Sequence, residues 1–88
     1  MGYDIRMKKV HPAFDRITFD PNVMGGRVCI RGMRVTVNLV LNLLANNMGT
    51  DAILDAYPYL EREDINQALR YAAWLSDDLV YESQLTAA

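Results

Sequence analysis

Residues 16–30 read RITFDPNVMGGRVCI, and this stretch decides how the N-terminal half of the chain folds. Ile17 and Phe19 alternate with polar residues, and Val28 and Ile30 alternate around a cysteine, which is the period-two pattern of half-buried strands. Asp-Pro-Asn and Gly-Gly between the two runs favour a turn, because proline fixes φ and glycine accepts positive φ. The stretch therefore predicts two short strands joined by a loop.

The residues before this stretch show no sustained apolar period. We expect residues 1–15 to form a basic arm or a loose edge strand, because they combine lysines with Pro12. His11 is the single histidine of the chain, and it has no cysteine or carboxylate at metal-ligand spacing. It is predicted to be a solvated loop histidine.

After residue 35 the apolar period lengthens from two to nearly four, which is typical of a helix. Val37, Val40 and Leu41 lie on one face of a helix predicted over residues 35–46. Two further leucines lie off that face. Either a second chain covers part of this helix, or one subunit buries a broad face of it.

Two more helices are predicted. Thr50 is expected to cap a short helix over residues 51–57, which Pro58 ends. The third helix is the longest: it begins near Glu61 and carries apolar residues at helical spacing to Leu79. The predicted fold is therefore mainly α, a three-helix homeodomain-like helix-turn-helix bundle preceded by a short N-terminal β-strand pair.

The chain of 88 residues is long enough for one domain only. We expect an arm or edge strand at 1–15, a single helix-turn-helix domain at 16–80 and a C-terminal tail at 81–88. The core of so small a domain is marginal, which favours a homodimer or a higher oligomer. The sequence shows no signal-peptide pattern and no apolar run near the roughly 18 residues of a membrane span, so we expect a cytoplasmic protein without membrane contact.

The net charge of −2 hides a strong asymmetry along the chain. Up to Arg34 there are seven Lys and Arg residues against three Asp and Glu, and after it two against eight. Such a chain can offer a basic face to phosphate and an acidic face to a basic protein. Alternatively, folding mixes the two sets of charges, or two subunits pair head to tail through them.

In a helix-turn-helix protein the third helix reads base edges in DNA. Arginine, asparagine and glutamine side chains lie near one face of the predicted third helix, and these residue types make bidentate contacts to guanine and adenine. The acidic start of that helix repels phosphate, so arginines before the first helix would supply much of the phosphate contact. Alternatively, this polar face of the third helix is only exposed to solvent and contacts no DNA. The candidate DNA-binding residues are Arg27, Arg31, Arg34, Arg62, Asn66, Gln67 and Arg70.

The sequence carries no catalytic pattern. Cys29 is the only cysteine, it has no base within motif spacing, and its alternation with Val28 and Ile30 indicates a strand residue. GGRVCIRG matches neither GxxxxGK[ST] nor GxGxxG. We therefore expect no enzymatic activity, no cofactor and no metal site.

Two segments carry a family resemblance: ITFDPNVMGGRVCIRGMRVTV, residues 17–37, and LLANNMGTDAILDAYPYLEREDINQALRYAA, residues 43–73. They resemble the family catalogued as domain of unknown function 433, which is described as homeodomain-like and taken to be antitoxin-like, of the VapB type. The resemblance implies an antitoxin of a type II toxin–antitoxin system. Such a protein neutralises a PIN-like nuclease toxin and represses its own operon by binding operator DNA.

Two departures from the family pattern bear on helix ends. Asn47 stands where glycine usually ends the first helix, and asparagine also adopts the left-handed conformation. Glu61 stands where threonine would cap the third helix, and a lost cap weakens a helix by about 1 kcal/mol.

The acidic C-terminal part, with its aromatic residues, would cover the basic surface of the toxin. Ordinary core or dimer packing is the alternative role for those aromatic residues. The alternative function is a protein-interaction module or dimerisation domain that does not bind DNA, which the pI near 5.1 favours. The candidate toxin-binding residues are Trp74, Asp77, Asp78, Tyr81 and Glu82.

Overall fold

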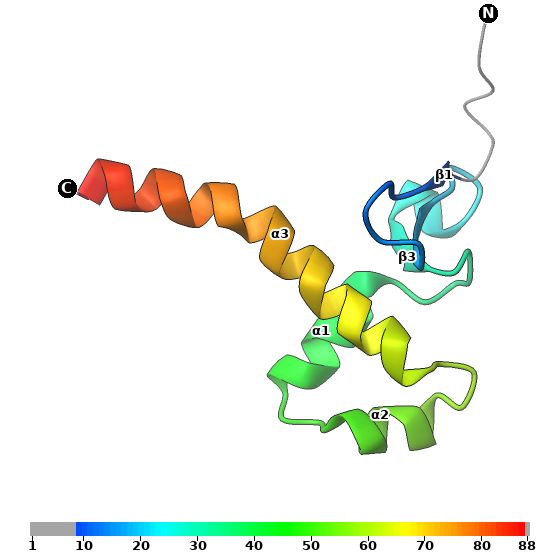
Figure 1. Cartoon of the computed structure of the whole chain (residues 1–88). Helices are drawn as coiled ribbons and strands as arrows, with labels where there is room; N and C mark the ends of the chain where they lie inside the picture. Colours follow the sequence, from blue (N-terminus) through cyan, green and yellow to red (C-terminus); the bar gives the residue numbers. More distant parts are fainter. Residues whose placement is uncertain (1–8, 88) are drawn as a thin grey trace, which may run out of the picture.

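The structure is a computed structural model that describes residues 9–87 of the chain, with side chains described over residues 9–77 (Figure 1). A small sheet and a short 3-10 turn come first, and three helices follow. The elements are β1 (Lys9–Val10), β2 (Ile17–Phe19), η1 (Met24–Gly26), β3 (Val28–Ile30), α1 (Val37–Ala45), α2 (Thr50–Ala56) and α3 (Arg62–Ala87).

The fold is α+β, and the prediction of a mainly α bundle with a strand pair is wrong. Three strands form an antiparallel sheet in the order β1-β2-β3, beside the three helices. The third strand is β1, which pairs Lys9 with Phe19 and Val10 with Thr18. Two residues are too few to show a period of two, so only the pairing with β2 reveals this strand. It lies at the sheet edge, in the segment expected to be an arm or edge strand.

The two predicted strands are confirmed as β2 and β3. They pair antiparallel with Ile17 opposite Ile30. The loop between them contains Gly25 and Gly26, whose φ angles of 66° and 84° lie in the left-handed region. Glycine reaches this region without strain, as the turn prediction required.

The helix ends show which local predictions hold. Thr36 begins α1, where its hydroxyl accepts a hydrogen bond from the Leu39 backbone at 3.0 Å. Asn47 has a φ of 69° after the end of α1, so the expected left-handed asparagine is confirmed. Thr50 does not cap α2: Gly49 holds the N-cap position and Thr50 is the first helical residue. Glycine is itself an acceptable N-cap residue, which explains the shift by one position.

The core joins one face of the sheet to all three helices. Five aliphatic side chains from β2, β3, α1, α2 and α3 are completely buried in it. They hold α3 against the sheet and the other two helices, which fixes where α3 leaves the body of the protein. The five are Ile17, Ile30, Val40, Ile53 and Ile65.

The third helix, α3, is the longest element and spans 26 residues. At 1.5 Å per residue it is about 39 Å long. Its first half packs on the body, and its second half projects beyond it (Figure 1). The expected tail at 81–88 continues this helix as far as Ala87. Among the described helices, none is long and apolar enough to cross a membrane.

Candidate protein-interaction site

A buried carboxylate holds the start of α3 against the sheet. Asp64 is 0% exposed. Arg31 donates to it through Nε, 2.9 Å from Oδ1, and Nη2, 2.9 Å from Oδ2, while Nη1 of Arg16 lies 3.0 Å from Oδ1. We call these three residues the Asp64 cluster. It shows that folding mixes the basic N-terminal charges with the acidic C-terminal ones, at least at this point.

Asp64 also caps the helix that carries it. The backbone N–H of Glu61 donates to its Oδ2 at 2.7 Å, which is the return bond of a capping box. Burial by itself raises the pKa of Asp64. The hydrogen bonds from Arg31, the Glu61 backbone and Arg16 outweigh burial and hold this pKa below its usual value. The carboxylate is therefore charged at neutral pH and supplies part of the capping that threonine would give.

Arg31 has a structural role that its sequence position did not reveal. Its backbone φ is 47°, in the left-handed region, and this conformation precedes Gly32 with a φ of 71°. Besides Asp64, its guanidinium donates to the Tyr59 carbonyl at 2.8 Å. Arg31, which was predicted to contact DNA, thus links the β3–α1 loop to the turn before α3.

The DNA-binding candidates on α3 differ in their surroundings. Gln67 accepts from a backbone N–H before β2 and donates to a carboxylate in the same loop. Asn66 is half-buried. Arg62 and Arg70 each pair with a carboxylate, but their side chains are 61% and 64% exposed. Gln67 therefore braces the fold, whereas the two arginines lie on the surface. The partners are Arg16 and Asp15 for Gln67, Asp51 for Arg62 and Glu63 for Arg70.

The two remaining candidates are exposed. Arg27 lies just before β3 and Arg34 lies in the loop after it. Within the part of the chain that the structure describes, neither side chain forms an ion pair.

An aromatic cluster joins the β1–β2 loop to the middle of α3. The His11 ring lies 5.0 Å from that of Phe14, 5.6 Å from that of Tyr71 and 5.0 Å from that of Trp74, centroid to centroid. His11 is half-buried, so the prediction of a solvated loop histidine is wrong. His11 lies 60 positions from Tyr71 and 63 from Trp74 in the chain, so no sequence spacing could have indicated these contacts.

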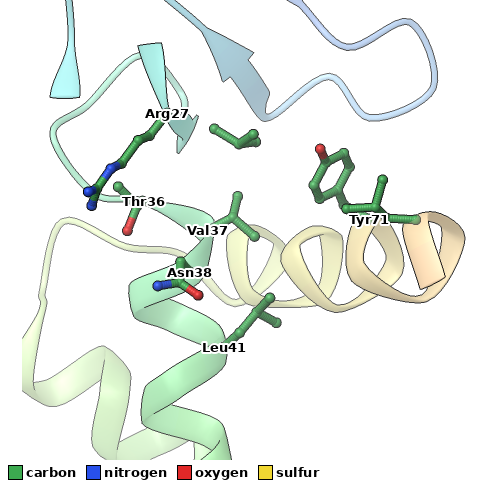
Figure 2. Close-up of a pocket in the computed structure, with 8 residues that line it drawn as sticks. Arg27, Thr36, Val37, Asn38, Leu41 and Tyr71 are labelled. Atoms are coloured by element: carbon green, nitrogen blue, oxygen red, sulfur yellow. The ribbon is translucent and has the colours of Figure 1, made fainter. Parts of the chain in front are cut away.

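A cavity of about 500 Å³ opens between β3, α1 and α3. Val37 and Leu41 of α1 lie between Tyr71 of α3 on one side and Arg27 on the other (Figure 2). We call this cavity the groove. Its lining is mainly apolar, and the guanidinium of Arg27 is the charged group at its border. The lining residues are Arg27, Val28, Thr36, Val37, Asn38, Leu41, Tyr71 and Leu75.

Beyond the groove, α3 presents exposed side chains of the kind expected to bind a partner. Trp74 is 55% exposed and Leu75 is 53% exposed. Asp77 is exposed as well. The side chains of Asp78, Tyr81 and Glu82 lie outside the described set, although their backbone belongs to α3. Asp77 and the backbone of residues 78, 81 and 82 thus belong to the projecting part of α3, whereas Trp74 packs in the aromatic cluster at the edge of the body.

Cys29 is buried in β3, as its strand pattern predicted, and burial raises the pKa of its thiol. Over residues 9–77, His, Cys, Asp and Glu side chains form no group of three or more that could hold a metal ion.

The family model described as "Protein of unknown function (DUF433)" matches residues 17–72. The chain belongs to the DUF433 family. The match contains Arg31 and Asp64 of the Asp64 cluster and most of the groove; it begins just after Arg16 and ends before Trp74. A relative from Sinorhizobium fredii, "Uncharacterized protein y4eO", is 32% identical over 71 residues. These cover 81% of this DUF433 chain but only 32% of that relative. No solved structure matches.

Proposed function

We propose that this DUF433 protein is a protein-binding module that acts as the antitoxin of a type II toxin–antitoxin pair. The observation that carries the proposal is the division of α3 into two halves. Its first half packs on the body, where Asp64 is buried and Gln67 binds the loop before β2, whereas its second half projects from the body and begins with exposed Leu75 and Asp77 (Figure 1). The first half is structural, and the second half is available to a partner.

The chemistry of the projecting half fits a basic protein surface. Residues 74, 77 and 81 are a tryptophan, an aspartate and a tyrosine, at positions i, i+3 and i+7 of one helix. That spacing places them on one face. Tryptophan and tyrosine are frequent anchors of protein interfaces, and an acidic residue beside them complements a basic partner. A PIN-like nuclease has a basic RNA-binding surface of this kind, which supports it as the toxin.

Removing residues 78–88 is expected to preserve the fold and to lower toxin affinity about 100-fold or more, because the central anchors of an interface carry most of its binding energy. The cut after Asp77 keeps Trp74 in the aromatic cluster and Leu75 at the groove. The measurement is a binding titration against a purified PIN-like nuclease, with circular dichroism to check helix content.

Two point variants sharpen this test. Tyr81→Ala leaves the rest of the segment in place and is expected to lower toxin affinity about tenfold. Leu69→Ala is the control, because Leu69 is 45% exposed on the first half of α3, outside the proposed toxin face. Toxin affinity that is the same for the truncated and full-length proteins would refute the proposed contact.

Operator DNA binding is the second candidate function, and exposed Arg34 supports it. Arg34 follows β3 in the basic N-terminal part, and it forms no ion pair with any described residue. Arg34→Ala is expected to reduce the slope of log affinity against log salt for the protein's upstream DNA by about one. Arg34→Lys is the control, because it keeps the positive charge at this position. A protein that fails to bind this DNA even at low salt is a protein-interaction module alone.

A further inference from the structure

We propose that the groove receives the C-terminal end of α3 from a second copy of this chain, which makes the protein a two-fold dimer. The proposal concerns a different surface from the toxin face and does not depend on the toxin. The occupant of the groove is the helix end of the other copy, and the paired charges at the border of the groove are Arg27 and Glu82.

The groove selects the chemistry of its occupant. Val28, Val37, Leu41 and Tyr71 form an apolar lining, while Arg27 is a cation without an ion-pair partner among the described residues. An apolar segment that carries a negative charge satisfies both features, because it buries apolar surface and neutralises the guanidinium. A basic or wholly polar segment would satisfy neither.

The projecting half of α3 has this chemistry. Ala68 and Tyr71 lie on the buried face of the helix, and Leu75 continues that face at the edge of the groove. In the sequence, leucine at 79 and glutamate at 82 follow Leu75 at i+4 and i+7, so the same helix face runs on beyond the body. The face thus combines apolar residues with an acid, as the groove requires.

Groove and helix end cannot meet within one chain. The middle of α3 itself lines the groove, and the helix then runs straight away from it without a turn (Figure 1). Two complementary surfaces on one chain that cannot reach each other are satisfied by a second copy. In the proposed dimer the helix end of each copy enters the groove of the other, so the interface is isologous and the assembly closes.

The toxin face stays accessible in this dimer. Residues 74, 77 and 81 lie about 100° or more around the helix from Leu75, at 100° per residue. Residues 75, 79 and 82 face the groove of the partner. One helix end can therefore join two copies and still present a second face to another protein.

The first test is the oligomeric state of the full chain by sedimentation equilibrium. The wild-type protein is expected to be a dimer, and Leu75→Asp to raise the dimer dissociation constant about 100-fold, because two copies of this central apolar contact are lost. Leu69→Asp is the matched control on the same helix, at 45% exposure against 53% for Leu75. It is expected to remain dimeric. A monomeric wild-type protein, a larger assembly, or equal effects of the two substitutions would overturn the proposal.

The second test is a charge exchange, which does not depend on an apolar substitution that could disturb folding. Arg27→Glu and Glu82→Arg are each expected to weaken the dimer about tenfold, since each places like charges opposite one another. The double variant is expected to restore most of the wild-type affinity. If it stays as weak as either single variant, this helix end does not occupy the groove.

Discussion

Asp64→Ala is expected to lower the free energy of unfolding by about 3–5 kcal/mol, because it strips two arginines of their common buried partner and removes a helix cap. Asp64 is completely buried and accepts hydrogen bonds from Arg31, Arg16 and the Glu61 backbone. A domain of this size has about 4–13 kcal/mol of stability in total, so the loss is a large share of it. Urea unfolding followed by circular dichroism measures the change.

The control for Asp64 is another aspartate that pairs with an arginine. Asp51 lies 2.6 Å from Arg62, but both side chains are mainly exposed. Asp51→Ala is therefore expected to cost no more than about 1 kcal/mol, as is usual for surface ion pairs. Equal losses for the two aspartates would contradict the role assigned to the Asp64 cluster.

Arg31→Ala is expected to cost about 2–3 kcal/mol, because it leaves the buried Asp64 carboxylate with fewer charged hydrogen bonds. The loss is smaller than for Asp64→Ala because Arg16 still pairs with the carboxylate and the Arg31 side chain is itself 34% exposed. The same urea measurement applies. Arg34→Ala, at an exposed loop position, is expected to change stability by less than about 0.5 kcal/mol.

A double-mutant cycle separates the pair from other effects of Arg31. If Arg31 acts through Asp64, the two single losses are not additive, and the coupling lies within about 0.5–3 kcal/mol. Additive losses would show that Arg31 stabilises the protein mainly through Tyr59 or its backbone conformation. The result also guides DNA-binding experiments, since a weaker signal from an Arg31 variant would reflect unfolding rather than a lost phosphate contact.

The sequence correctly predicted those structural features that depend on local residue patterns. Alternation found β2 and β3, helical spacing found the three helices, and the left-handed preference of asparagine predicted Asn47 after α1. Each of these features depends on residues within a few positions of one another. The capping position of α2 shifted by one residue because Gly49 and Thr50 are both acceptable at a helix start.

The features that the sequence missed depend on residues far apart in the chain. The strand β1 is too short to have a period, His11 meets Trp74 across 63 positions, and Arg31 meets Asp64 across 33. An arginine or glutamine can bind a partner or brace its own fold with the same chemistry. Only the tertiary arrangement decides between the two, as Arg31 and Gln67 show by binding residues of their own chain.

The unbroken course of α3 has a mechanical consequence. The Asp64 cluster fixes the first turn of this helix to the sheet, and the same helix continues without a hinge to the residues proposed to bind a partner. The helix therefore works as a lever arm whose direction is set at its base. A change that loosened the base would alter the angle at which a bound partner is held, even though no contact with that partner had been touched.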